Sequence, residues 1–197
     1  TSGTTNDLLG VHFVNSNTGW VVTNRGEILK TSDGGTNWTS QTSGTIVELN
    51  SVFFVDKNIG WVVGNASSGK YSELRKTTDG GSTWISQSSG TTKYLNSVNF
   101  IDSNTGWAVG NDGTILKTTD GGSNWSSESS GTTKNINSIH MYDANTGWVV
   151  GNSGLVIKYS DTTAPTVTSV SSTADNGAYG IGSVIPITVT FSESVTV

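Results

Sequence analysis

The feature that most constrains this chain is a nine-residue stretch that occurs three times, at residues 30–38, 76–84 and 117–125. Each copy has Lys first, then Asp, Gly-Gly, two small polar residues and Trp. Glycine adopts positive φ without steric cost, and Asp, Asn and Ser favour turns. Because apolar-patterned segments flank each copy, the stretch predicts the tip of a β-hairpin.

A Gly-Trp pair marks a longer repeat, with tryptophans spaced by 41, 46 and 41 residues at Trp20, Trp61, Trp107 and Trp148. A period near 40 built only from strand-like segments indicates propeller blades. The third repeat predicts strands at 96–101, 106–110, 114–118 and 124–129, with a tight turn at 111–113. The predicted fold class is therefore all-β, with four four-stranded antiparallel repeats. The longer interval reflects an insertion at 66–73, which we expect in a loop.

The turn residues have a structural interpretation. We expect the Asp carboxylate to accept backbone N–H groups of its own turn, and the Trp to pack the hairpin against its neighbour. Calcium binding by the Asp residues is the alternative, but the identical repetition of each Asp favours a structural role. The predicted structural set is Asp33, Gly35, Trp38, Asp79, Gly81, Trp84, Asp120, Gly122 and Trp125.

The repeat pattern changes near residue 162, where Thr-Thr-Ala-Pro replaces the Gly-Gly turn. We therefore predict repeats over 1–162 and, over 163–197, the start of an Ig-like β-sandwich, since strand-like segments follow at 166–170 and 184–191 around a Gly-rich turn at 176–182. The fourth repeat has three convincing strands and an unpaired outer edge. Either 166–170 fills this edge or a neighbouring molecule does, and we favour the neighbour.

Composition narrows the partners. Only 13% of the residues are charged and the net charge is −5, which disfavours nucleic acid and anionic membranes. The chain has no Cys, and no stretch approaches the roughly 20 apolar residues of a membrane span. Ser, Thr, Asn and Gly dominate the polar positions, which is typical of a secreted bacterial surface protein. No cofactor site is evident.

The repeated stretch, as in Thr31-Ser-Asp-Gly-Gly-Thr-Asn-Trp38, resembles the Asp-box, or bacterial neuraminidase repeat. Together with Asn-Thr-Gly-Trp-x-Val-Gly, the unit is similar to the propellers of the photosystem II stability and assembly factor family. This resemblance covers residues 1 to about 161 and implies a propeller fold. Propellers serve as enzymes, scaffolds and binding modules, so it implies no particular activity. The segment Phe191-Ser-Glu-Ser-Val195 is similar to bacterial Ig-like surface modules.

Catalysis receives little support. Sialidases, which share the Asp-box, need a cluster of arginines, and this chain has only Arg25 and Arg75. No carboxylate is marked by its context as a glycosidase residue. His12 and His140 occupy equivalent strand positions, where packing between blades is a simpler explanation than metal binding. Tyr71, in the insertion, and Tyr94, before an inner strand, are the candidate ligand contacts.

We therefore expect a non-enzymatic interaction module of a secreted, multidomain surface protein, acting in adhesion or extracellular assembly. Its expected partner is a protein or a glycan, with possible homo-oligomers through open strand edges. Two alternatives remain open. One is a subunit of an extracellular filament completed by neighbouring chains, and the other is a fragment of a secreted glycoside hydrolase whose catalytic residues lie outside this chain.

Overall fold

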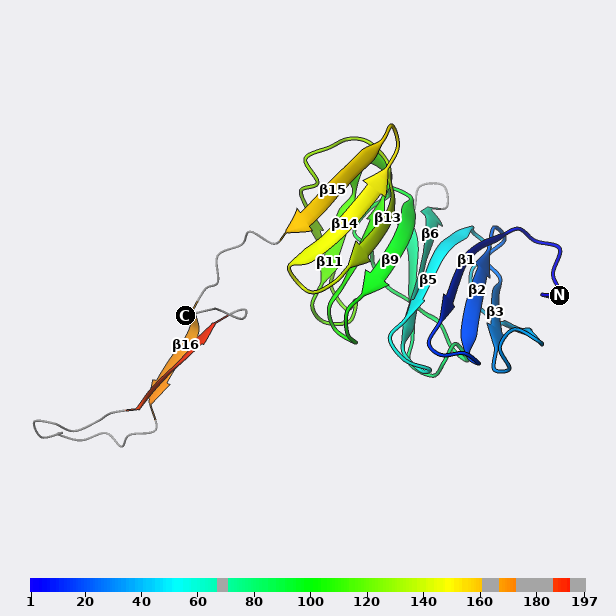
Figure 1. Cartoon of the computed structure of the whole chain (residues 1–197), viewed down its shortest axis with the longest axis horizontal. Helices are drawn as coiled ribbons and strands as arrows, with labels where there is room; N and C mark the ends of the chain where they lie inside the picture. The colour runs from blue at the N-terminus through cyan, green and yellow to red at the C-terminus, as the bar shows by residue number, and fades with distance from the viewer. Residues whose placement is uncertain (67–70, 161–166, 173–185, 192–197) are drawn as a thin grey trace, which may run out of the picture. The chain divides into compact units, whose positions relative to one another are not determined.

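The computed structural model describes residues 1–66, 71–160, 167–172 and 186–191 (Figure 1). The chain divides into two units, Thr1–Ser160 and Asp161–Val197. The division lies two residues before the end of the predicted repeat region. Apart from the short 3₁₀ turn η1 (Asn111–Gly113), the described secondary structure is β-strand. The described residues contain no helix that is long and apolar enough to cross a membrane.

The first unit consists of four antiparallel sheets, each a blade formed by consecutive strands. Blade 1 contains β1 (Leu8–Phe13), β2 (Gly19–Thr23), β3 (Ile28–Thr31) and β4 (Thr39–Gln41); blade 2 contains β5 (Leu49–Phe54), β6 (Gly60–Ala66), β7 (Ser72–Thr77) and β8 (Ile85–Ser86). Blade 3 contains β9 (Leu95–Phe100), β10 (Gly106–Gly110), β11 (Ile115–Thr118) and β12 (Ser126–Glu128); blade 4 contains β13 (Ile136–Met141), β14 (Thr146–Gly151) and β15 (Leu155–Ser160). The predicted all-β fold of propeller blades is confirmed.

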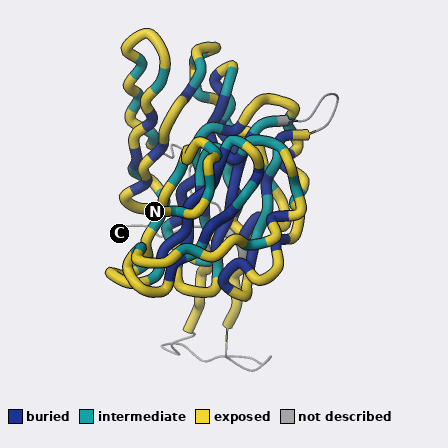
Figure 2. The backbone as a smooth tube through the Cα atoms, turned by 90° about the vertical axis from the view of Figure 1, so that its right-hand side faces the viewer, coloured by how far each residue is buried: buried dark blue, intermediate teal, exposed yellow. Residues whose placement is uncertain are grey.

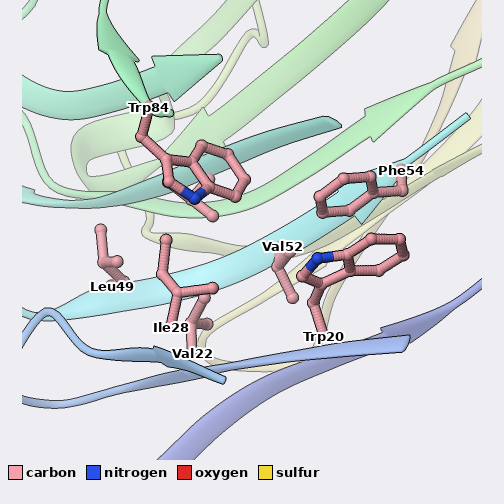
Figure 3. Close-up of a cluster of buried hydrophobic side chains, with 8 residues drawn as sticks. Trp20, Val22, Ile28, Leu49, Val52, Phe54 and Trp84 are labelled. Atoms are coloured by element: carbon pink, nitrogen blue, oxygen red, sulfur yellow. The ribbon is translucent and has the colours of Figure 1, made fainter. Parts of the chain in front are cut away.

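The blades stack in chain order. Inner strand β1 contacts β5, β5 contacts β9, and β9 contacts β13 (Figure 1). The core lies between the sheets, where the buried stretches run through the interior while the loops are exposed (Figure 2). Between blades 1 and 2, Trp20 stacks on Phe54 with ring centroids 3.5 Å apart and planes 7° apart (Figure 3). Trp61 and Phe100 repeat this arrangement between blades 2 and 3, at 3.5 Å and 9°.

The box tryptophans reach the same core from the outer hairpin. Trp84 is buried in the cluster that joins blades 1 and 2, and its ring meets Phe54 edge-on at 5.8 Å (Figure 3). Trp125 meets Phe100 in the same way at 5.9 Å. Trp84 and Trp125 therefore each hold in place the Phe on which the preceding blade stacks.

Within the described residues blade 4 has three strands, as its own sequence predicts for the fourth repeat, so the pattern of four strands per repeat applies to blades 1 to 3. The segment predicted as one possible fourth strand lies in β16 (Val167–Ser172) of the second unit, where it pairs antiparallel with β17 (Ile187–Phe191). One detail differs from the sequence prediction. The loop predicted at 66–73 in blade 2 is shorter, because Ser72 and Glu73 belong to strand β7.

The second unit contributes the two-stranded sheet of β16 and β17, in which Val167 pairs with Phe191 and Ser172 with Ile187. Val170 and Val189 are exposed, so this pair buries little apolar surface by itself. The predicted Gly-rich turn at 176–182 lies outside the described residues. The Ig-like assignment stays a prediction.

Replacing Trp84 by Ala is expected to lower the free energy of unfolding by about 3–5 kcal/mol, because it leaves a cavity between two blades. Trp38 is the matched control, since it occupies the same turn position in blade 1 but is only half-buried. Trp38→Ala should therefore cost less. Urea denaturation of both variants measures the difference, and equal losses would contradict the inter-blade role of Trp84.

Candidate functional site

The Asp of each repeated turn is held by groups of its own turn. In Asp79, Oδ1 accepts the backbone N–H of Thr83 at 2.9 Å and the hydroxyl of Thr77 at 2.8 Å, while Oδ2 accepts the hydroxyl of Thr83 at 2.6 Å. Asp33 and Asp120 form the same network, with an Asn amide in place of the Thr hydroxyl. The carboxylates therefore stabilise their turns.

These hydrogen bonds favour the charged form of the Asp side chains. The side-chain hydrogen bond from Thr83, followed by its backbone N–H, lowers the pKa of Asp79 to about 2. The side-chain and backbone groups of Asn124 lower the pKa of Asp120 to about 2 in the same way. The pKa of Asp33 is also lowered, chiefly by the backbone N–H of Asn37.

The first glycine of the turn connects one blade to the blade before it. The carbonyl oxygen of Gly80, in blade 2, accepts hydrogen bonds from Trp20 Nε1 at 3.3 Å, Lys30 Nζ at 3.0 Å and Gln41 Nε2 at 3.1 Å, all in blade 1. Gly121 accepts Trp61 Nε1 at 3.1 Å. Gly80 has φ +70°, and a Cβ there would lie 2.7 Å from the Lys57 carbonyl oxygen. A side chain at this position would therefore disturb the contact.

The lysine at the first position of each repeated stretch lies over the Trp ring of its own blade. Lys30 Nζ lies 5.3 Å from the Trp20 ring centroid, and Lys76 and Lys117 lie 5.2 and 5.5 Å from the rings of Trp61 and Trp107. At these distances an ammonium group is attracted to the face of an indole ring. The indole N–H of Trp107 is buried without a hydrogen-bond partner among the residues that the structure describes.

The other Asp-containing turns are explained by local hydrogen bonding. Asp56 Oδ1 accepts the backbone N–H groups of Asn58 at 2.7 Å and Ile59 at 2.8 Å. Asp102 makes the same pair of bonds. Among the residues that the structure describes, no three His, Asp or Glu side chains gather into a possible metal site. The Asp residues therefore have structural partners that need no ion.

The two histidines lie in different surroundings. His12 packs against Phe53 of the neighbouring blade with ring centroids 4.5 Å apart, and its partial burial lowers its pKa. His140 is exposed on β13. The two residues belong to the blades at opposite ends of the array, so the structure does not bring them together (Figure 1).

A cleft of about 1520 Å³ lies between blades 1 and 2 and holds both arginines of the chain. Arg25 comes from the β2–β3 turn, and Arg75 comes from β7 on the other side. Most of the remaining lining comes from residues 40–47 and 86–88, which bring Ser, Thr and Gln side chains together with Ile46 and Val47. A smaller hollow of about 570 Å³ in blade 3 contains Lys134 and no arginine. The cleft between blades 1 and 2 is the larger of these two recesses, and its lining holds Glu27 and Glu73 as well as the two arginines.

The charged groups of the cleft differ in their availability. Arg75 Nε donates to the Glu73 carboxylate, and both side chains are less than one-fifth exposed. Glu27 accepts hydrogen bonds from Thr4 at 2.8 Å and from Asn6 at 3.1 Å. Arg25 is exposed, and no carboxylate in the described part of the chain forms a salt bridge with it. Arg25 is therefore the cation that an incoming anion would meet first.

Only one of the two candidate tyrosines belongs to this cleft. Tyr71 is exposed at its rim. Tyr94 is exposed before β9 and does not line the cleft. The repeat alignment holds one further signal for this site. Arg75 occupies the strand position that Leu29 and Leu116 fill in blades 1 and 3. A charged residue at a core position of a repeat indicates a specialised blade.

The Asp turns are expected to make stability depend on acidity. A carboxylate with a lowered pKa stabilises the folded state above its unfolded pKa of about 3.9, and this contribution is lost as the pH falls toward about 2. Thermal melts from pH 7 to pH 2 should show that Asp79→Asn with Asp120→Asn lowers Tm most at pH 7, with a difference from wild type that narrows below pH 4. A constant difference would contradict this role.

We also expect that the Asp turns need no calcium. Their carboxylate oxygens already accept hydrogen bonds from the turn. EDTA should therefore leave Tm unchanged, and adding calcium back should have no effect. A sharp fall in Tm in EDTA that calcium reverses would show that the turns bind the ion.

Comparison with known proteins identifies related propellers. The family model described as "Photosynthesis system II assembly factor YCF48" matches residues 2–90, 43–127 and 84–165 in overlapping passes. No curated protein sequence matches the chain. The structure of YCF48 from Cyanidioschyzon merolae is 19% identical with a TM-score of 0.65, and the match covers 79% of this chain and 51% of that one.

Two further solved structures share the fold. One, described as YCF48 bound to D1 peptide, is 18% identical with a TM-score of 0.59, over 85% of this chain and 57% of that one. The other, the GH74 enzyme of Niastella koreensis, is 21% identical with a TM-score of 0.62, over 78% of this chain and 28% of that one. The chain thus spans about half the length of the YCF48 structures. These similarities show a shared propeller fold.

Proposed function

Because the chain belongs to the family of photosynthesis system II assembly factor YCF48, we propose that it is a non-catalytic module that binds a segment of a partner protein. The observation that carries the proposal is the cleft between blades 1 and 2, with Arg25, Arg75 and Tyr71 in its lining. A similar propeller is known with a bound peptide, which supports a peptide as the type of ligand. The partner here is proposed from the chemistry of this chain's own cleft.

The cleft suits an extended peptide with one acidic group. A guanidinium group binds a carboxylate through two parallel hydrogen bonds, and Arg25 is free to do so. The Ser, Thr and Gln side chains of residues 40–45 and 86–88 offer hydrogen bonds to a peptide backbone. Tyr71 at the rim supplies an aromatic surface for an apolar side chain.

The carboxylates of the cleft favour binding over catalysis. A glycosidase needs two carboxyl groups, one to donate a proton and the other to act as base or nucleophile. Glu73 is paired with Arg75, and Glu27 accepts hydrogen bonds from Thr4 and Asn6. The alternative is a fragment of a secreted glycoside hydrolase whose catalytic residues lie outside this chain, which the fold shared with a GH74 enzyme favours.

We place this module in a secreted, multidomain surface protein that acts in adhesion or extracellular assembly. The Ser-, Thr-, Asn- and Gly-rich composition of the chain supports this setting. The antiparallel pair of β16 and β17 supports a second β domain, which we propose to be Ig-like. Peptide binding by the propeller would serve either role.

The proposal predicts binding that depends on one charge pair. A panel of fluorescein-labelled decapeptides that contain Asp or Glu is compared with twins that carry Asn or Gln and an amidated C-terminus. At least some acidic peptides should bind, and their twins should bind roughly tenfold more weakly, since a hydrogen bond to a charged group contributes about 1.5–3 kcal/mol. Fluorescence anisotropy measures both, and Arg25→Ala should weaken the acidic peptides equally.

Lys134→Ala is the control, because Lys134 lines the smaller hollow of blade 3. It should leave peptide binding unchanged. The cleft would be excluded as the site if the Asn- or Gln-containing peptides bound as tightly as the acidic ones. It would also be excluded if Arg25→Ala and Lys134→Ala weakened binding equally. Release of reducing ends from a polysaccharide panel by the full-length protein, unchanged by Glu27→Gln and Glu73→Gln, would favour the glycoside hydrolase alternative.

A further inference from the structure

The loop between blades 1 and 2 departs from the repeat in one respect. The segments that lead into the four blades share a Ser-Gly-Thr triplet, which stands at residues 2–4, 43–45, 89–91 and 130–132. The two residues after the triplet are Thr-Asn before blade 1 and Thr-Lys before blades 3 and 4. Before blade 2 they are Ile46 and Val47. An apolar pair thus replaces a polar pair at one place in the array.

This apolar pair lines the cleft between blades 1 and 2. Ile46 is 89% exposed, and Tyr71, which lines the same cleft, is 59% exposed. A single exposed apolar residue is ordinary in a folded protein. Here Ile46, Val47 and Tyr71 all stand at positions that are polar or missing in the other repeats, and they share one recess with Arg25. Their gathering in one cleft therefore indicates a binding surface.

Hydrogen bonds fix the backbone of this loop. The buried Ser43 donates its hydroxyl to the Thr45 carbonyl oxygen at 3.1 Å and accepts the Thr45 N–H at 3.2 Å. The Val47 N–H donates to Thr45 Oγ1 at 3.2 Å. Because the backbone is held in place before any ligand arrives, covering the exposed side chain of Ile46 costs little conformational entropy.

The same loop lies directly against the turn that carries Arg25. A Cβ added to Gly26 would lie 2.7 Å from the Thr45 carbonyl oxygen and 3.1 Å from the Ile46 carbonyl carbon. Arg25 and Ile46 therefore come from two backbone segments that are in contact. An extended peptide advances about 3.3 Å per residue, so neighbouring side chains of one ligand can reach both.

The next junction shows which interaction this surface replaces. There Lys93 stands at the position of Val47, and its Nζ forms a salt bridge at 2.6 Å with Asp112 in the turn of the following blade. At the first junction the insertion that carries Tyr71 takes the place of that turn. A paired charge in blade 3 thus corresponds to exposed apolar surface in the cleft.

We propose that Ile46, Val47 and Tyr71 form an apolar subsite of the cleft. The ligand is then a peptide that carries a bulky apolar side chain, such as Leu or Phe, within about three residues of the acidic group that Arg25 binds. Ile46 determines this specificity, because it is the most exposed member of the subsite and belongs to the segment that contacts the Arg25 turn. The inference rests on the proposed peptide binding and adds a selectivity that an acidic group alone does not give.

A matched series of peptides measures this selectivity. Fluorescein-labelled decapeptides with one Asp, and with Leu placed one, two or three residues from it, are compared with twins in which Ser replaces the Leu. In fluorescence anisotropy, the wild type should bind the best Leu peptide about tenfold more tightly than its Ser twin, because the Leu side chain is removed from water in the subsite.

Ile46→Thr introduces the residue that the other three segments carry, so this variant should fold. It should bind the Leu peptide about fivefold more weakly than the wild type does and bind the Ser twin equally well. Ile46→Leu should keep the preference for the Leu peptide. Ile85→Thr is the matched control and should change neither affinity, since Ile85 is 67% exposed on β8 and does not line the cleft.

The outcomes separate this inference from the proposed function. If the wild type bound both peptides equally and Arg25→Ala weakened both, the apolar subsite would be excluded while acidic peptide binding stood. Equal weakening of both peptides by Ile46→Thr would also overturn the subsite, because Ile46 would then act on the cleft as a whole. If no acidic peptide bound at all, the proposed function would fail and the subsite with it.

Discussion

The structure depends on one contact between blades, the packing of a Trp on the last residue of the next inner strand, which is Phe at two junctions and Met141 at the third. Trp20 lies on Phe54 and Trp61 on Phe100, at the same centroid distance of 3.5 Å. The indole N–H groups then donate to the carbonyl oxygens of Gly80 and Gly121 in the following turns. A single residue type thus joins the apolar core to the polar outer hairpin, and each blade depends on its neighbour to bury its surface.

The repeated turn has a consistent role in this architecture. Its Asp stabilises the turn by local hydrogen bonds, and the carbonyl oxygen of its first Gly accepts hydrogen bonds from the preceding blade. Its Trp packs edge-on against the Phe on which the preceding blade stacks. None of these roles uses a ligand. The candidate binding residues Arg25, Arg75 and Tyr71 lie elsewhere, in loops and on a strand where blade 2 departs from the common pattern. A uniform scaffold with one divergent blade is a reasonable basis for specific binding.

The sequence predicted the blades well because their signals are local and repeated. The third repeat shows this, since its predicted strands match β9 to β12 within two residues at every end. The role of Gly80 was not predictable in this way, because its donors are 39 to 60 residues away in the chain. The partner of β16 was not predictable either, since an alternating strand fits any open edge. Tyr71 and Tyr94 look alike as exposed aromatics, and only the fold places Tyr71 beside the arginines.

The central claim is that the Trp-on-Phe contact couples neighbouring blades energetically. A double-mutant cycle on Trp61→Leu and Phe100→Leu, measured by urea denaturation, tests it most directly. The account predicts a coupling free energy of about 0.5–1.5 kcal/mol between the two residues, as expected for an aromatic pair beyond its buried area. Changes in the free energy of unfolding that simply add, within about 0.3 kcal/mol, would contradict it.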